Sequence, residues 1–267
     1  MQEVLFASAN LTLRGELYLS DQTNSPGILV CHGMHAEGFR WLPLYRSFAR
    51  TAADRGLSCL LFDFRGCGKS DGQFDYGMGE QADARASLDF LLKQPGIDSS
   101  NAFILGRSLG GTIALYSFMD DPRVKGFALW ATPPDHKRNI VNFIVRTRGR
   151  LGYWSFVLLS AIDRFVDATR VLRMDVWGLK MRPKEVRGKL MTLSGARLVS
   201  RKECAPIFLV AGSDDGFVNA LETKDYEASI PGRKQLIVLE GTGHTFKGAE
   251  EEAISGTIDW FVRLKNS

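Results

Sequence analysis

The sequence has 267 residues, of which 45% are hydrophobic, and a formal net charge of +4. A chain of this length can bury a full core, so we expect a single α/β domain over residues 1–267. The apolar run Leu158–Ile162 is far shorter than the roughly 20 residues of a membrane-spanning helix, and Met1–Ser20 lacks a secretory pattern, which excludes a membrane span and predicts a cytoplasmic protein.

The chain begins with a predicted antiparallel hairpin at the edge of a sheet. Leu11, Leu13, Gly15, Leu17 and Leu19 alternate with polar or aromatic residues and are expected to pair with Glu3–Ser8. Six later apolar runs predict strands that are buried on both faces. They are Gly27–His32, Leu57–Asp63, Ala102–Gly106, Gly126–Trp130, Pro206–Ala211 and Gln235–Glu240.

Amphipathic segments of helical length separate most of these strands. They are Arg40–Arg55, Gly79–Gln94, Leu109–Met119, Asn219–Ile230 and Gly248–Leu264. Strands that alternate with helices indicate a mostly parallel sheet with helices on both faces. We therefore predict an α/β fold whose sheet has an antiparallel N-terminal edge.

Residues 133–201 interrupt this alternation. They contain no clear buried strand but have helical-looking runs such as Asn139–Val145 and Leu151–Val166, so we expect a helical cap over the carboxyl ends of the strands. Lys137 to Lys202 contain 16 Lys or Arg and 4 Asp or Glu. This positive charge could meet an anionic ligand or surface, or it could form a solvated face. Because no nucleic-acid reader motif accompanies it, we do not expect nucleic-acid binding.

Residues 106–111 have the sequence GRSLGG and lie between a predicted strand and a predicted helix. A serine on such a tight turn needs small neighbours two residues away on either side, which Gly106 and Gly110 supply. The following helix directs its positive N-terminal end toward Ser108, which favours negative charge on a bound carbonyl. Ser108 is therefore a candidate nucleophile.

A serine hydroxyl needs a neighbouring base, and a third group must orient that base. Among the four histidines, His244 has the best position, because it follows the last predicted strand at the carboxyl edge of the sheet. Asp214 and Asp215 follow the preceding strand at the same edge, and either could orient the imidazole. The order serine, aspartate, histidine is that of α/β hydrolases.

The chain resembles the α/β-hydrolase superfamily over nearly its whole length outside the cap. Within it, the sequence is similar to small-cap esterases, lipases and cinnamoyl-esterase-like enzymes that are related to serine aminopeptidases. The resemblance rests on HG at 32–33, DFRGCGKS at 63–70, the Ser108 turn, GSDDGFV at 212–218 and GH at 243–244. It implies the α/β-hydrolase fold, with the cap inserted at about residues 133–201.

The resemblance also assigns site residues. In relatives the aspartate lies three residues after the glycine and three before the valine, which matches Asp215 and not Asp214. Relatives use two backbone N–H groups as the oxyanion hole, here those of Met34 and Leu109. His32, Asp63 and Arg65 are interpreted as residues that brace loops.

The expected activity is hydrolysis of a carboxylic ester through an acyl-enzyme, with a small-molecule substrate. The alternatives are an acyl thioesterase, a peptide or amide hydrolase, and a non-catalytic ligand-binding protein on the same fold. Cys31, Cys59, Cys67 and Cys204 have no metal-ligand spacing. We expect reduced thiols and neither a metal nor a cofactor. Tyr153, Trp154 and Trp177 are expected either to line an acyl pocket or to pack within the cap.

Overall fold

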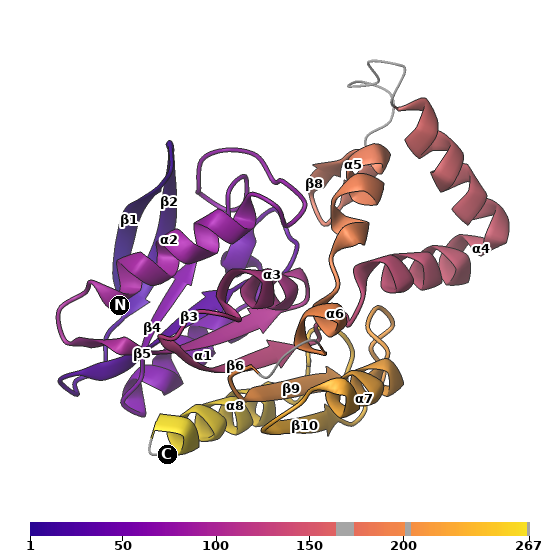
Figure 1. Cartoon of the computed structure of the whole chain (residues 1–267). Coiled ribbons are helices and arrows are strands. Elements are labelled where there is room, and N and C mark those ends of the chain that lie inside the picture. Colours follow the sequence, from indigo (N-terminus) through magenta and orange to yellow (C-terminus); the bar gives the residue numbers. More distant parts are fainter. Residues whose placement is uncertain (164–173, 201–203, 266–267) are drawn as a thin grey trace.

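The computed structural model describes residues 1–163, 174–200 and 204–265, and a central sheet dominates it (Figure 1). The strands of this sheet are β1 (Gln2–Ser8), β2 (Leu11–Tyr18), β3 (Ser25–Cys31), β4 (Ser58–Phe62), β5 (Ile97–Arg107), β6 (Val124–Trp130), β9 (Ile207–Gly212) and β10 (Lys234–Leu239). Within the described residues they are arranged in the order β1-β2-β4-β3-β5-β6-β9-β10.

The strand directions confirm the predicted sheet. β1 pairs with β2 and β2 with β4 in antiparallel fashion, and the remaining neighbours are parallel. β5 starts earlier than the predicted Ala102, at Ile97, which pairs with Ser25 of β3. Residues 98–101 are polar, so a search for apolar runs places the start of this strand at Ala102.

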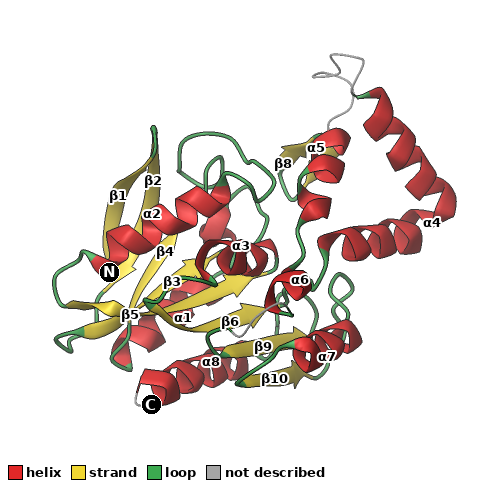
Figure 2. Cartoon of the chain, viewed as in Figure 1, coloured by secondary structure: helices red, strands yellow, loops and turns green. Residues whose placement is uncertain are grey.

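Helices cover both faces of the sheet (Figure 2). They are α1 (Leu44–Asp54), α2 (Glu80–Leu92), α3 (Leu109–Phe118), α7 (Ala220–Ser229) and α8 (Glu250–Lys265), with the short 3-10 helix η1 (Gly38–Trp41) before α1. Leu29 and Leu60 pack in one core with α2 and α3, whereas the neighbouring Val30 and Leu61 pack in a second core with α1 and α8. Because both faces are covered, the strands have continuous apolar sequences.

The segment between β6 and β9, which we call the cap, lies apart from the sheet, on the side toward which the parallel strands point (Figure 1). Its elements are α4 (His136–Ile162), β7 (Met174–Val176), β8 (Leu179–Met181), α5 (Pro183–Gly188), the 3-10 helix η2 (Leu190–Thr192) and α6 (Gly195–Val199). The predicted helical runs are the two halves of α4, which bends at the non-helical Gly149, and residues 164–166 lie outside the described ranges. No described helix is long and apolar enough to cross a bilayer.

β7 and β8 correct the expectation that residues 133–201 contain no clear buried strand. They form an antiparallel hairpin in which Val176 pairs with Leu179, and Leu179 and Met181 are buried. Trp177 and Gly178 form the two-residue turn, both with positive φ, of 51° and 79°. Strands of three residues are too short to show a recognisable alternation.

Buried polar side chains brace the loop after β4. Arg65 donates from Nε and Nη2 to the two carboxylate oxygens of Asp83 on α2, each at 2.8 Å, and Asp83 is fully buried. On the same loop, Asp63 accepts hydrogen bonds from the backbone N–H groups of Phe39 and Lys69. Asp63 and Arg65 therefore hold the loop in place, as the sequence indicated.

Removal of the buried carboxylate should destabilise the fold. We predict that Asp83→Asn lowers the free energy of unfolding by about 3 kcal/mol, because the charge of Arg65 loses its partner in a largely buried site. The measurement is urea unfolding followed by circular dichroism. Asp259→Asn is the matched control, since Asp259 pairs with Arg55 on the exposed surface, where a pair contributes less than about 1 kcal/mol. Equal losses in the two variants would contradict the prediction.

Candidate active site

Ser108 lies at the sharp junction between β5 and α3. Its backbone has a φ of 51° and a ψ of −124°, which L-residues rarely adopt and which costs about 1–3 kcal/mol. The Ser108 N–H donates to the carbonyl of Trp130 on β6 at 2.8 Å, which helps to hold this conformation. Strained backbone of this kind often occurs at functional sites.

Glycines on either side allow α3 to cross close to the sheet. A Cβ on Gly106 would overlap the backbone of Gly111, and a Cβ on Gly110 would overlap the carbonyl oxygen of Cys31 at the end of β3. The two small residues around Ser108 are therefore required by direct backbone contact, as the motif predicted.

The loop after β3 lies against Ser108. A Cβ on Gly33 would be 3.3 Å from the Cβ of Ser108. His32 braces this loop, because its Nδ1 donates to the Gly33 carbonyl at 2.6 Å and its Nε2 accepts from the Phe64 N–H at 3.0 Å. Burial lowers the pKa of His32 to about 4, so the ring is neutral and structural. Met34 follows in this loop.

Leu109 occupies the first position of α3. The N–H groups at the start of a helix have no intrahelical partner, so that of Leu109 is available to an acceptor beside Ser108. The positive end of the helix dipole adds to this preference for an anion.

His244 and Asp215 form a close pair. His244 Nδ1 lies 2.7 Å from Asp215 Oδ2, while Asp215 Oδ1 accepts from the N–H groups of Phe217 and Val218 at 2.7 and 2.9 Å. Burial alone would raise the pKa of Asp215, but the hydrogen bond from His244 and the two backbone donors lower it below its ordinary value. The carboxylate is therefore ionised and acts as an acceptor.

Asp214 has a different environment from its neighbour. Its side chain is exposed and accepts a hydrogen bond from the hydroxyl of Ser213 at 3.0 Å. The structure thus joins His244 to Asp215 rather than to Asp214.

The protonation of His244 follows from this pair. An ionised carboxylate only accepts, so Nδ1 carries the proton and Nε2 remains an acceptor. Burial lowers the pKa of His244, the hydrogen bond to Asp215 raises it, and the charge of Arg107 lowers it, with a net shift below the ordinary value of 6.5. The ring is therefore neutral at pH 7 and can accept a proton.

Arg107 was not singled out in the sequence, although it adjoins Ser108. It is almost fully buried, and its Nη2 donates to the carbonyl of His244 at 2.5 Å. Its guanidinium lies 5.4 Å from the Trp41 ring, and in the described part of the chain it has no carboxylate partner. Arg107 thus ties the His244 loop to the end of β5. Its position inside the motif is variable, so the sequence offered no signal for this contact.

The other two histidines have other partners. His136 is buried at the start of α4, with Nε2 2.9 Å from Thr112 Oγ1, and burial lowers its pKa to about 4. His35 stacks on Trp41 at 4.4 Å. Among the residues that the structure describes, no carboxylate is hydrogen-bonded to either ring to orient it as a base.

An aromatic series connects the cap to His244. The Phe217 ring lies 5.5 Å from the His244 ring and 5.5 Å from the Trp177 ring, and Phe143 of α4 packs on its side at 5.4 Å. Trp177 also accepts a hydrogen bond from the Ala36 N–H with its carbonyl, at 3.0 Å. Trp177 therefore reaches both loops of the site, whereas Tyr153 and Trp154 contact each other farther out on α4.

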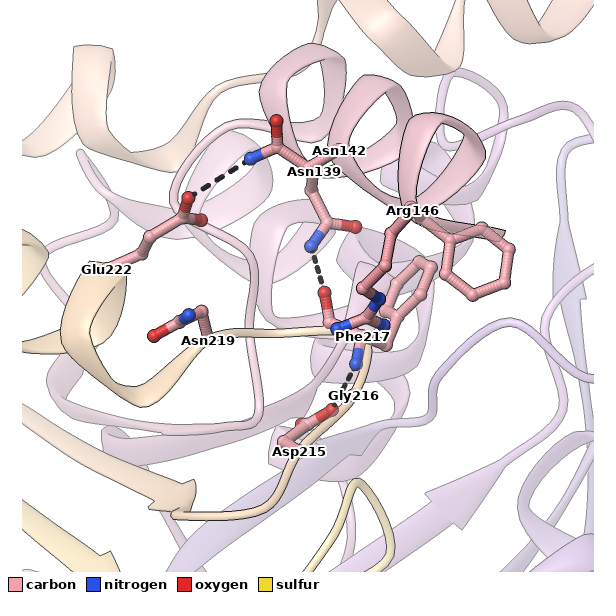
Figure 3. Close-up of a pocket in the computed structure, with 9 residues that line it drawn as sticks. Asn139, Asn142, Arg146, Asp215, Gly216, Phe217, Asn219 and Glu222 are labelled. Atoms are coloured by element: carbon pink, nitrogen blue, oxygen red, sulfur yellow. Dashed lines mark hydrogen bonds between the residues drawn. The ribbon is translucent and has the colours of Figure 1, made fainter. Parts of the chain in front are cut away.

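A pocket of about 200 Å³ separates α4 from the loop of Asp215 (Figure 3). Asn139, Asn142 and Arg146 point from α4 toward this loop and toward α7. Asn139 Nδ2 donates to the carbonyl of Phe217, and Asn142 donates to Glu222 at 3.2 Å. The cap helix thus braces the loop that orients His244.

The positive charge of the cap is partly neutralised. Arg138 pairs with Glu222, and Lys189 pairs with Asp75 of the main body. Around the bend of α4, however, three arginines have no ion-pair partner among the residues that the structure describes, namely Arg146, Arg148 and Arg150.

Comparisons with known proteins identify the family of the chain. The family model described as "Serine aminopeptidase, S33" matches residues 23–251. The chain is 32% identical over 136 residues to the uncharacterized protein RP471 of Rickettsia prowazekii, which is 50% of this chain and 56% of that protein. It is 33% identical over 127 residues to the thiohydrolase aneE of Aspergillus aculeatus, which is 46% of this chain and 39% of that protein. Each alignment therefore spans only part of the relative.

Solved structures extend the likeness to the whole fold. The α/β hydrolase GrgF from Penicillium sp. has a TM-score of 0.71, with 98% of both chains covered and 18% sequence identity. At this identity the likeness shows the fold alone. The predicted α/β-hydrolase fold is confirmed.

The charge of Arg107 should be measurable through the histidines. We predict that Arg107→Met raises the pKa values of His244 and His35, because the nearby positive charge disfavours both imidazolium forms. The pKa of His136 should not change, since burial and Asp135 determine it. The measurement is an NMR titration of the histidine ring signals. An unchanged pKa of His244 would show that Arg107 exerts no field there.

Proposed function

Because the chain belongs to the serine aminopeptidase S33 family and has the α/β-hydrolase fold, we propose that it is a serine hydrolase that cleaves a carboxylic ester. The observation that carries the proposal is the 2.7 Å pair of His244 and Asp215, together with the bond by which Arg107 ties the His244 loop to the strained turn at Ser108. This arrangement provides a base, its orienting carboxylate and a candidate nucleophile at one edge of the sheet.

In the proposed reaction, Ser108 Oγ attacks the substrate carbonyl while its proton passes to His244 Nε2. Asp215 stabilises the imidazolium that results. The N–H groups of Met34 and Leu109 donate to the oxyanion, and the start of α3 stabilises its charge. The imidazolium then protonates the departing alkoxide, which leaves an acyl group on Ser108.

Water completes the cycle. His244 removes a proton from a water molecule, the hydroxide attacks the acyl carbonyl, and the Ser108 oxygen leaves with the proton that His244 returns. The products are an alcohol and a carboxylic acid, so the reaction needs no redox partner. A small-molecule substrate would enter beneath the cap, beside Phe217 and Trp177.

A thioester is the second candidate substrate. Ser108 can attack a thioester carbonyl in the same way, and the protein aneE, which matches part of this chain, is named a thiohydrolase. The family name suggests amides as a third class. A panel of nitrophenyl esters, acyl thioesters and aminoacyl amides, compared by kcat/KM, separates these substrates.

Ser108 is tested directly by covalent labelling. We predict that a fluorophosphonate probe labels the wild-type protein and that Ser108→Ala loses both labelling and ester turnover, by about 10⁴-fold or more in kcat. Mass spectrometry of the labelled peptide gives the position. Ser255→Ala, which removes an exposed hydroxyl on α8, is the matched control and should be labelled normally. Labelling that survives Ser108→Ala would exclude Ser108 as the nucleophile.

The two neighbouring aspartates should differ sharply. We predict that Asp215→Asn lowers kcat by about 10⁴-fold, because an amide cannot hold His244 in the required tautomer. Asp214→Asn should retain most of the activity, since Asp214 is exposed and contacts Ser213. Steady-state kinetics on one nitrophenyl ester measures both. Comparable losses in the two variants would contradict the assignment.

A further inference from the structure

The second half of α4, after the bend at Gly149, has an inner face that is attached to the cap. Phe156 and Ser160 are buried on this face, and the hydroxyl of Ser160 accepts from Arg187 at 3.2 Å. Asp163, directly after the helix, pairs with Arg182 at 2.9 Å. These contacts fix which face of the helix points outward. In Figure 1 this half of α4 forms the outer edge of the molecule.

The outward face of this half is apolar. Leu151, Trp154, Leu158 and Ile162 are 83%, 65%, 61% and 40% exposed, and we call these four residues the outer stripe. Their spacing of three or four residues places them on one side of the helix. Single exposed apolar residues are ordinary, but an aligned group that includes a tryptophan is typical of a surface that binds another apolar phase.

The charges of α4 all have one sign. The helix contains five basic residues and no acidic one, and Arg148 and Arg150 immediately precede the outer stripe without ion-pair partners in the described ranges. An amphipathic helix with tryptophan and leucine on its apolar side and arginines beside them is suited to lie in a membrane interface. We propose that the outer stripe, together with Arg148 and Arg150, docks on the surface of an anionic lipid bilayer.

The positive charge of α4 favours an anionic bilayer over a second copy of the chain as the partner of the outer stripe. Pairing of two outer stripes would bring the positive charges of two α4 helices together, which opposes association. An anionic bilayer instead attracts each basic side chain and strengthens binding by a factor of about five per residue. The exposed Trp154 adds a side chain that favours the interface between lipid and water.

The test is co-sedimentation of the full chain with vesicles. Wild-type protein should bind vesicles of phosphatidylcholine mixed with phosphatidylglycerol more tightly than vesicles of phosphatidylcholine alone, and added salt should weaken the binding. Trp154→Ser combined with Leu158→Ser should weaken binding about tenfold or more, as should Arg148→Glu combined with Arg150→Glu. Hydrolysis of a soluble ester should be unchanged in both variants, so this test is independent of the proposed reaction.

Two remote substitutions serve as matched controls. Leu221→Ser removes an exposed leucine on α7, and Arg14→Glu reverses an exposed charge on β2, and neither should change vesicle binding. Equal binding to neutral and anionic vesicles would overturn the proposal. So would unchanged binding in either α4 variant, or a wild-type dimer that ignores vesicles and dissociates when Trp154 and Leu158 are replaced, as measured by sedimentation velocity.

Discussion

The close crossing of α3 over the end of β3 is the constraint on which the candidate site depends. Gly110 lies so near the carbonyl of Cys31 that any side chain there would overlap it. At this crossing Ser108, which joins β5 to α3, has a positive φ of 51°. The crossing also brings the loop of His32 and Gly33 against Ser108. One backbone contact therefore holds Ser108 and the start of α3 beside the loop that contains Met34.

Buried polar side chains then hold the loops at this edge of the sheet. His32 connects the loop after β3 to the loop after β4, and Arg107 connects β5 to the loop of His244. His32 is neutral above about pH 4, so its bracing does not change across the physiological range. His244 differs, because its partner is a carboxylate, so both the hydrogen bond to Asp215 and the charge of Asp215 raise its pKa against the effect of burial. The same residue type thus has a fixed structural role in one loop and a titratable ring in the other.

The sequence predicted the sheet, and it singled out most residues of the candidate site, because these features have strong local signals. Strands that are covered by helices on both faces have apolar sequences. The glycines around Ser108 are recognisable because a Cβ at either position would overlap neighbouring backbone atoms. The resemblance favoured Asp215 over Asp214, and Asp215 is the aspartate whose side chain lies 2.7 Å from His244. The β7–β8 hairpin and the contact of Arg107 were missed. The hairpin is too short to show periodicity, and the contact joins residues that are far apart in the chain.

The cap is connected to both sides of the site. The carbonyl of Trp177 holds the loop after Met34 through Ala36, and its ring packs on Phe217, which in turn packs on His244. Asn139 of α4 donates to the carbonyl of Phe217, and the N–H of the same peptide group, that of Val218, donates to Asp215. A shift of α4 would therefore act on the peptide group that positions the carboxylate. The contact of Asn139 comes from the first half of α4, before the bend at Gly149, so this half of the helix supports the geometry of His244 and Asp215.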